Sequence, residues 1–377
     1  MNEEKVLLVD DNPTNLQVLF QTLEGRGYNQ LVAKNGETAL AIAGRAHPHL
    51  ILLDIMMPGM DGYDVCRQLK ADPTTQDIPV IFLSALGDTK DKVQGLNLGA
   101  VDYITKPFQP EEVIARVNTH LTIYRLKREV QEKRDELEHE LQLVAEEQRN
   151  LLPDQLPQIE GLKLAAHYET SRYAGGDYYD IIQLPDDRWG FMMADAAGHS
   201  TSAAVLVAMT CALLRSLPEP PVEPDKVLKS INTHLCDLSA DNFITALYTV
   251  YDAKSHTLSI ARAGHPPPIL YRPENGKAIE LPCKGVFPMA IDPYGDVPLT
   301  KTKLQAGDRM LLYTDGITER FNPQGKCYEV ERLCEKFAEE CENDVRKSMT
   351  MIIEDVNRFA DGLPAQDDQA ILVLMVE

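Results

Sequence analysis

A helical pattern that contains neither Gly nor Pro runs from residue 120 to residue 152 and stops at Pro153. Along it, mostly apolar positions recur at alternating steps of three and four residues, with one additional step of four after Leu137. These positions are Ile123, Leu126, Val130, Lys133, Leu137, Leu141, Val144, Gln148 and Leu151. A narrow apolar seam on an otherwise charged helix predicts a two-stranded coiled coil between two copies of the chain, over residues 121–152. A single solvated spacer helix is the alternative.

Ahead of this helix, residues 1–120 alternate short apolar runs with helical patterns five times in succession. The runs at 5–9, 31–33, 50–53, 80–83 and 102–104 are predicted strands, and 15–23, 37–43, 63–69, 90–98 and 111–121 are predicted helices. Five β-α units of this length predict an α/β domain with a doubly wound, parallel, five-stranded sheet. In such sheets the functional side chains gather at the carboxyl ends of the strands.

After the helix, residues 153–377 have a different pattern, in which strands and helices form separate groups. Strands are predicted at 162–168, 179–184, 189–195, 245–251, 257–262, 269–272, 309–313 and 370–376, and helices at 203–217, 224–238, 330–341 and 345–360. This grouping predicts an α+β layered fold. The chain is thus expected to have three parts, at residues 1–120, 121–152 and 153–377.

The composition narrows the possible partners and compartment. The formal net charge is −21 over 377 residues, which disfavours binding to nucleic acid or to an anionic membrane surface. The acidic start of the chain lacks the apolar run of a secretory signal, and no apolar run is long enough to cross a bilayer. Seven cysteines include no C-x-x-C pair. We therefore expect a cytoplasmic protein with reduced thiols.

Polar residues follow the predicted strands of the first domain. Asp10 and Asp11 follow the first strand, Asp54 the third, Ser84 the fourth and Lys106 the fifth. Three converging carboxylates repel one another unless a cation joins them, and Mg²⁺ suits such oxygen ligands. With a hydroxyl and an ammonium group nearby, the central carboxylate could accept a phosphoryl group. Each residue alone could instead cap the helix that follows it.

The segments VLLVDDN, LLDIMMPGMDG, FLSA and TKPF, which carry these residues, resemble the receiver domain of bacterial response regulators. The resemblance implies that a sensor histidine kinase or a phosphotransfer protein phosphorylates Asp54. It further implies that Asp10 and Asp11, with Asp54, hold Mg²⁺, and that Ser84 and Lys106 contact the phosphoryl group. Tyr103 matches the aromatic switch position, and Lys106-Pro107 matches a cis peptide bond.

The second domain has four acidic signals of its own. Asp177 follows two glycines, Asp195 and Asp315 end apolar strands, and Asp367 and Asp368 directly precede the last strand. An isolated Asp at a strand end is usually a turn residue. Four such signals favour a site for two Mg²⁺ or Mn²⁺ ions, at which water attacks a phosphate directly. His199 could protonate the leaving oxygen, or it could be a structural hydrogen-bond donor.

The segments EEQRNLLP, GGDYYD, ADAAGHSTSAA, AGHPPPIL, LLYTDGITE and DDQAILVL resemble the PPM family of metal-dependent Ser/Thr phosphatases. Within it they are similar to the bacterial branch of SpoIIE and RsbU, which implies a layered β-sandwich controlled by the helix ahead of it. The metal ligands implied are Asp177, Asp195, Asp315 and Asp367, with the Ala196 carbonyl, and Asp368 as the weaker alternative to Asp367. Ser200 and Ala370 depart from the family's usual motifs.

The sequence therefore predicts a dimeric response regulator whose output is the dephosphorylation of phosphoserine or phosphothreonine. The resemblance implies an anti-sigma-factor antagonist, a small STAS-domain protein, as the substrate in a partner-switching pathway. The alternative is a non-catalytic adaptor with a phosphatase-like fold, which the Ser200 and Ala370 departures keep open. GGDYYD is also similar to the GGDEF signature of diguanylate cyclases, but a cyclase would have no use for the TDG and terminal DD segments.

Overall fold

The computed structural model of the chain describes residues 4–84, 95, 97–171, 175–198, 201–217, 220, 222–238, 242–342 and 344–377. Its contacts divide it into two compact units, Met1–Leu137 and Glu138–Glu377, and each unit is described by itself. The division falls within one helix, α5 (Pro110–Arg149). The three-part division at residues 120 and 152 stays a prediction.

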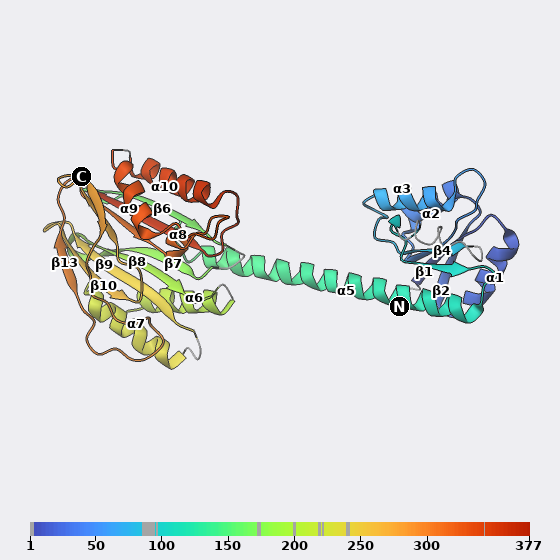
Figure 1. Cartoon of the computed structure of the whole chain (residues 1–377). Helices are drawn as coiled ribbons and strands as arrows, with labels where there is room; N and C mark the ends of the chain where they lie inside the picture. Colours follow the sequence, from blue (N-terminus) through green and yellow to red (C-terminus); the bar gives the residue numbers. More distant parts are fainter. Residues whose placement is uncertain are drawn as a thin grey trace. The chain divides into compact units, whose positions relative to one another are not determined.

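The first unit is an α/β fold built on a parallel sheet with the strand order β2-β1-β3-β4-β5, which confirms the predicted doubly wound sheet (Figure 1). Its strands are β1 (Glu4–Val9), β2 (Tyr28–Ala33), β3 (Leu50–Asp54), β4 (Val80–Ser84) and β5 (Asp102–Thr105). Its helices ahead of α5 include α1 (Pro13–Leu23), α2 (Gly36–Ala46) and α3 (Gly62–Ala71). The helix predicted at 90–98 lies mostly outside the described residues.

The central strand β3 explains why this domain is readable from its apolar runs. Leu50 and Leu52 pack into one apolar cluster with α1 and the start of α5, whereas Ile51 and Leu53 pack into another with α2 and α3. A strand covered by helices on both faces needs apolar residues at every position. The buried run therefore ends at Asp54, at the carboxyl edge of the sheet.

Helix α5 joins two helices that the sequence pattern had separated. Its first turns bury Val113, Val117 and Leu121 against the sheet of the first unit. The seam residues that follow are exposed, with 52% of Leu126 and 68% of Val130 accessible to solvent. The helix ends at Arg149, three residues before the predicted end.

The second unit is a sandwich of two antiparallel sheets with helices on both outer faces (Figure 1). The strand orders are β13-β10-β9-β8-β7 and β12-β11-β14-β15-β6. The first sheet contains β7 (Asp177–Leu184), β8 (Arg188–Ala196), β9 (Ile244–Asp252), β10 (Thr257–Ala263) and β13 (Thr300–Lys303), and α6 (Thr201–Arg215) and α7 (Pro224–Leu238) pack against it. The second contains β6 (Leu162–Glu169), β11 (Ile269–Arg272), β12 (Lys277–Glu280), β14 (Arg309–Tyr313) and β15 (Gln369–Val376), with α9 (Val330–Glu339) and α10 (Val345–Ala360) against it.

Strand β8 shows how the layers form. Phe191 and Met193 point into the apolar cluster between the two sheets, and Met192 and Ala194 point into the cluster under α6 and α7. The period of two that divides these side chains is the ordinary strand alternation, with both faces covered. The acidic residue Asp195 follows, near the end of this buried run.

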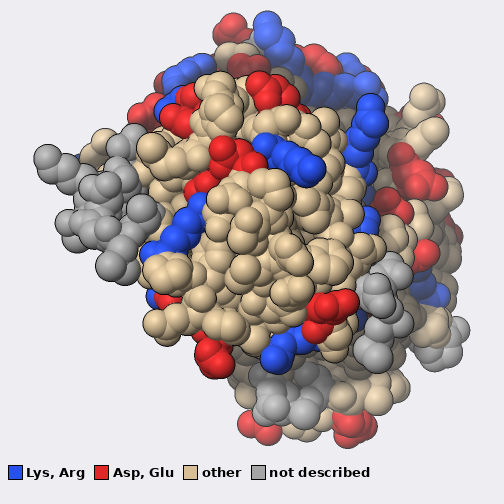
Figure 2. Space-filling view, turned by 90° about the vertical axis from the view of Figure 1, so that its right-hand side faces the viewer, with Lys and Arg blue, Asp and Glu red and all other residues tan. Residues whose placement is uncertain are grey.

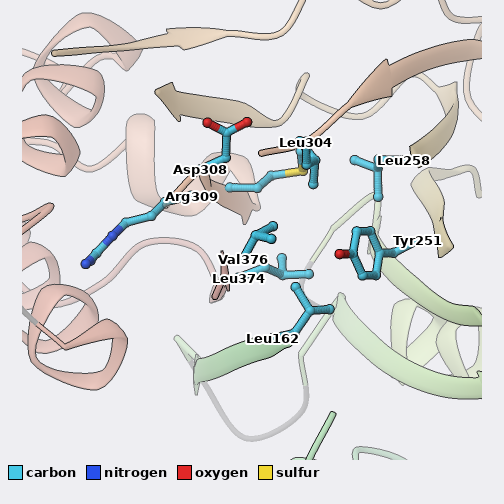
Figure 3. Close-up of a pocket in the computed structure, with 9 residues that line it drawn as sticks. Leu162, Tyr251, Leu258, Leu304, Asp308, Arg309, Leu374 and Val376 are labelled. Carbon is cyan, nitrogen blue, oxygen red and sulfur yellow. The ribbon is translucent and has the colours of Figure 1, made fainter. Parts of the chain in front are cut away.

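A small apolar hollow lies between the sheets, at the start of β14 and the end of β15 (Figure 3). The acidic residues Asp315 and Asp367 lie at the opposite ends of these two strands. Leu162, Tyr251, Leu258, Leu304 and Leu374 line most of it, and Asp308 at its edge accepts a hydrogen bond from the Gln305 amide. The hollow is thus part of the sandwich core and not a metal site.

None of the described helices is apolar over a length that could span a membrane.

Candidate metal centres

The first acidic cluster lies at the carboxyl edge of the parallel sheet. Ligand oxygens of Asp10, Asp11 and Asp54 lie within 4.8 Å of one another, and among the described residues no other trio of candidate ligands is so compact. Asp10 and Asp54 are buried, while Asp11 is exposed. Such a set of oxygen atoms, open to water on one side, fits Mg²⁺.

Lys106 joins two of these carboxylates. Its Nζ lies 2.8 Å from Asp10 Oδ2 and 2.8 Å from Asp54 Oδ1. Burial raises the pKa of Asp54, the Asp10 carboxylate raises it further, and the Lys106 ammonium opposes both. The peptide bond between Lys106 and Pro107 is cis, as the receiver resemblance implies.

Three further residues at this part of the sheet have different surroundings. Ser84 Oγ is buried and has no hydrogen-bond partner among the described residues, which fits a group that contacts an added phosphoryl oxygen. The Tyr103 ring lies 5.6 Å from the Arg116 guanidinium, at the edge of the same sheet. Asn15, for which no role was predicted, donates to both Asp10 oxygens at 3.0 Å.

The second acidic cluster joins the two sheets of the sandwich. Asp177 and Asp195 are directly paired across β7 and β8 of one sheet. Asp315 begins the short helix α8 (Asp315–Thr318) just after β14 of the other sheet, and Asp367 precedes β15 beside it. The Thr314 hydroxyl donates to Asp177 Oδ2 at 2.6 Å and thereby connects the sheets.

These carboxylates act strongly on one another. Burial raises the pKa of Asp195 to about 8, and its four most influential charged neighbours are all acidic: Asp315, Asp367, Asp368 and Glu319. Burial likewise raises the pKa of Asp315 to about 6, with Asp367 and Glu319 adding to the rise. Asp177 is 2% exposed, and its pKa is also raised by burial and by Asp195. Divalent cations would remove this repulsion, so the donor set fits a metal centre.

The two neighbouring carboxylates Asp367 and Asp368 have different surroundings. Asp368 is buried, and its two oxygens accept hydrogen bonds from the backbone amides of Ser171 and Gly176. Asp367 is half-buried and accepts a bond from the Asp368 amide. Asp368 thus holds the backbone ahead of Asp177, and the choice of Asp367 as the metal ligand stays a prediction.

Glycine is required at two close backbone approaches beside the second acidic cluster. A Cβ atom on Gly176 would lie 2.5 Å from the Ala196 carbonyl oxygen, and one on Gly316 would lie 1.8 Å from the Asp368 carbonyl oxygen. The Ala196 amide in turn donates to the Gly176 carbonyl at 2.9 Å. The glycines thus let backbone and carboxylates approach one another, and the Ala196 carbonyl as a metal ligand stays a prediction.

The two departures from the family motifs have different outcomes. Ala370 is fully buried in the apolar cluster between the sheets, and its backbone amide donates a hydrogen bond to Thr314 Oγ1 at 2.9 Å. Its small side chain is therefore accommodated as part of the core. Ser200 and His199 lie outside the described residues.

Two residues near this centre received no role from the sequence. Glu319 is exposed, one helical turn after Asp315, and raises the pKa of both Asp195 and Asp315. His265 is fully buried, with Nδ1 2.8 Å from Thr245 Oγ1 and Nε2 3.1 Å from the Tyr313 carbonyl oxygen. Thr245 on β9 is paired with Asp195, and Tyr313 on β14 is two residues before Asp315, so His265 joins β9 and β14 beside the two carboxylates.

We expect the affinity of the second cluster for Mn²⁺ to rise as the pH rises from about 6 to about 8, the values to which the pKa of Asp315 and of Asp195 are raised. Below these values the carboxyls hold protons that the metal must displace, at a cost of roughly tenfold in affinity per pH unit for each proton. Calorimetric titration in two buffers of different ionisation enthalpy measures the protons released. The same titration of Asp177→Asn gives the contribution of the first cluster, and an affinity independent of pH would contradict the prediction.

Known proteins resemble both units. A family model described as "Stage II sporulation protein E (SpoIIE)" matches residues 185–377, and one described as "Response regulator receiver domain" matches residues 6–118. "Probable transcriptional regulator ycf27" of Porphyridium aerugineum is 46% identical over 121 residues, which are 32% of this chain and 49% of that protein. The chain thus spans about half the length of this curated relative. The matches confirm both resemblances read from the sequence.

Two solved structures share the fold of the second unit. The SiaA-PP2C domain of Pseudomonas aeruginosa is 18% identical with a TM-score of 0.56, and the match covers 65% of this chain and 99% of that one. The PP2C phosphatase domain of SpoIIE from Bacillus subtilis, with a fragment of its regulatory domain, is 20% identical with a TM-score of 0.51, and the match covers 58% and 64%. The predicted layered β-sandwich is therefore confirmed as a PP2C fold.

Proposed function

The chain belongs to the family described as Stage II sporulation protein E, and from this premise we propose that it is a protein phosphatase controlled by its own receiver domain. The observation that carries the proposal is the cluster of mutually repelling carboxylates at the junction of the two sheets. Asp177, Asp195, Asp315 and Asp367, with the Ala196 carbonyl, would hold two Mg²⁺ or Mn²⁺ ions there. When bound, such ions lower the pKa of a coordinated water and offset the charge of a phosphate group.

The reaction we propose is the hydrolysis of a phosphoserine or phosphothreonine ester. A water oxygen forms a bond to phosphorus, the bond between phosphorus and the side-chain oxygen breaks, and that oxygen takes up a proton. Asp177 and Asp195, fixed on paired strands, set the geometry of one side of the site, and Asp315 and Asp367 set the other. Thr314 holds Asp177 in place through its hydroxyl. We assign the proton donor to His199.

In the first unit we propose that Asp54 accepts a phosphoryl group from a sensor histidine kinase or a phosphotransfer protein. Asp10, Asp11 and Asp54 would hold Mg²⁺, while Lys106 and Ser84 would contact the phosphoryl oxygens and Tyr103 would reorient.

Figure 2 views the molecule from the side of Figure 1 on which α1 lies, and its central area has few charged side chains. Helix α1 has no charged residue and exposes Val18 and Phe20. This face suits a protein partner of apolar character.

The substrate we propose is a phosphorylated anti-sigma-factor antagonist of the STAS class. Support comes from the family match and from the sequence resemblance to the SpoIIE and RsbU branch. The test is release of phosphate from such a phosphoprotein by the full chain with Mn²⁺, with and without acetyl phosphate to phosphorylate the receiver. Release that EDTA abolishes and acetyl phosphate alters supports the proposal. Binding of the phosphoprotein without phosphate release would favour the adaptor.

We also propose that the exposed part of α5 pairs with a second copy of the chain. Ile123, Leu126, Val130 and Leu137 are all more than half exposed along one stripe of this helix. Leu126→Glu is expected to weaken the dimer about a hundredfold, because each copy loses a buried leucine worth about 1.5 kcal/mol or more. Light scattering over a range of concentrations measures the dissociation.

The matched control for that change is Gln131→Glu, which introduces the same residue on the outer side of the same helix. It is expected to leave the dimer intact. A wild-type chain that stays monomeric at all concentrations would support the solvated spacer helix instead.

A further inference from the structure

The last turn of α5 contains a buried polar residue in an otherwise exposed stretch of helix. Gln148 is 7% exposed, whereas the residues on both sides of it are exposed. The heptad pattern predicts that Gln148 and Leu151 lie in a seam between two copies, and in the structure both side chains contact residues of their own chain. Leu151 packs against the apolar cluster under α6 and α7, and Gln148 contacts the backbone beside the acidic cluster.

The Gln148 side-chain amide binds both backbone polar groups of one residue, Gly175. Its Nε2 donates to the Gly175 carbonyl oxygen, and its Oε1 accepts from the Gly175 amide at 2.9 Å. Both Gln148 and Gly175 are buried, so these two bonds satisfy groups that water does not reach. Loss of the amide would leave a buried backbone N–H and C=O without their partner, which is costly.

The residue held in this way is two positions before the predicted ligand Asp177. The next amide, of Gly176, donates to Asp368, so consecutive backbone groups are held from α5 and from the start of β15. Gly175 is also closely packed on the side where a side chain would lie, because a Cβ atom there would be 2.8 Å from both Asp368 Oδ2 and Tyr168 Oη. A shift of Gln148 would therefore move the backbone that leads into Asp177.

A second contact fixes the same strand after Asp177. The Leu151 carbonyl oxygen accepts from Arg215 Nη2 at 2.9 Å, and Arg215 Nε lies 2.9 Å from Asp180 Oδ2. Asp180 is three residues after Asp177 on β7, and Arg215 ends α6. Gln148 at the end of α5 thus contacts the backbone just before β7. Leu151, in the turn after α5, is linked through Arg215 to Asp180 within β7.

We propose that Gln148 is the positioning residue through which the rotation and register of α5 set the metal centre, an inference that rests on the proposed phosphatase function. One residue of register change turns a helix by about 100°, which would withdraw the amide from Gly175 and release the backbone before Asp177. The metal centre is formed when the Gln148 amide is bonded to Gly175, and it is disrupted when that amide is withdrawn. Receiver phosphorylation would act on the centre by shifting α5 between these two states.

The test replaces the amide by an apolar group of similar size in the full chain. Gln148→Met is expected to raise the Mn²⁺ concentration that half-saturates the second cluster roughly tenfold or more, the usual effect of losing a residue that orients a metal ligand. Calorimetric titration measures it, with the second cluster identified as the binding that Asp177→Asn removes. Gln142→Met, the same change at an exposed position of the same helix, is expected to leave the affinity unchanged.

A second measurement separates positioning from mere stability. Hydrolysis of p-nitrophenyl phosphate with Mn²⁺ is compared with and without acetyl phosphate, and mass spectrometry confirms phosphorylation of Asp54. The ratio of the two rates is expected to fall to one in Gln148→Met and to keep its wild-type value in Gln142→Met. If Gln148→Met does not fold, Gln148→Asn, which keeps the amide but shortens its reach, is measured in its place.

The outcomes separate this inference from the proposed function. A wild-type chain without hydrolysis of any phosphate ester would contradict the function, while the Mn²⁺ titration would still test Gln148. A wild-type affinity for Mn²⁺ in the folded Gln148 variant would overturn the inference, whatever the activity. So would an active, phosphorylation-dependent enzyme in which the variant responds as the wild type does.

Discussion

Asp177→Asn is expected to lower the rate of Mn²⁺-dependent phosphate ester hydrolysis by roughly a thousandfold, a loss comparable to removal of a main stabilising group in an active site. Asn keeps the shape of the side chain and can still accept the hydrogen bond from Thr314. It cannot supply a second anionic oxygen to a metal pair. Steady-state kinetics with p-nitrophenyl phosphate at saturating Mn²⁺ measures the effect.

The same variant is expected to be no less stable than the wild type in EDTA. Burial and the neighbouring Asp195 raise the pKa of Asp177, which means that its charge is unfavourable in the metal-free fold. Thermal unfolding with and without Mn²⁺ tests this. Mn²⁺ bound at the second cluster should raise the melting temperature of the wild type, and Asp177→Asn should lose that rise. Asp186→Asn is the matched control, since Asp186 is exposed and its ion pair with Arg188 lies at the surface. Equal losses in both variants would contradict the site.

Asp54→Asn is expected to abolish phosphorylation of the chain by acetyl phosphate. The group that would attack phosphorus is the Asp54 carboxylate, whose Oδ1 lies 2.8 Å from Lys106 Nζ, and an amide is not a nucleophile of this kind. Mass spectrometry of the intact chain measures the added phosphoryl group. The phosphatase rate of the variant should then be the same with and without acetyl phosphate.

Asp64→Asn serves as the control for that variant, because Asp64 is partly exposed on α3 and forms a surface ion pair with Arg67. It should take up one phosphoryl group as the wild type does. Persistent phosphorylation of Asp54→Asn would point to another acceptor and would contradict the role of Asp54.

The fold was predictable where burial dictates the residue at each position. Strands such as β3 and β8 are covered on both faces, so their apolar runs and the Asp residues near their ends were visible in the sequence. Strands β12 and β13 were missed, because they lie at the edges of their sheets and have the polar sequences KAIE and TKTK. An edge strand buries too little side chain to impose a pattern.

The same reasoning explains what was and was not predictable about the acidic centre. Asp177, Asp195, Asp315 and Asp367 could be singled out because each is next to a glycine or a buried strand. Glu319 could have been found by its place one helical turn after Asp315, once a helix was expected there. Gln148 could not, because its partner is a backbone peptide, and a heptad pattern does not distinguish a seam from a contact within one chain.

His265, the buried histidine that braces β9 and β14, has a consequence for how the protein should behave in acid. Burial lowers its pKa to about 3, so the imidazole stays neutral in the folded chain, whereas in the unfolded chain it takes up a proton near its ordinary pKa of 6.5. Its contribution to folding is therefore complete above that value and is progressively lost as the pH falls toward 3. Inactivation in this acidic range would then reflect loosening of the sandwich, and the melting temperature should fall with the pH even in EDTA, where the weakening of Mn²⁺ binding between about pH 8 and about pH 6 has no effect.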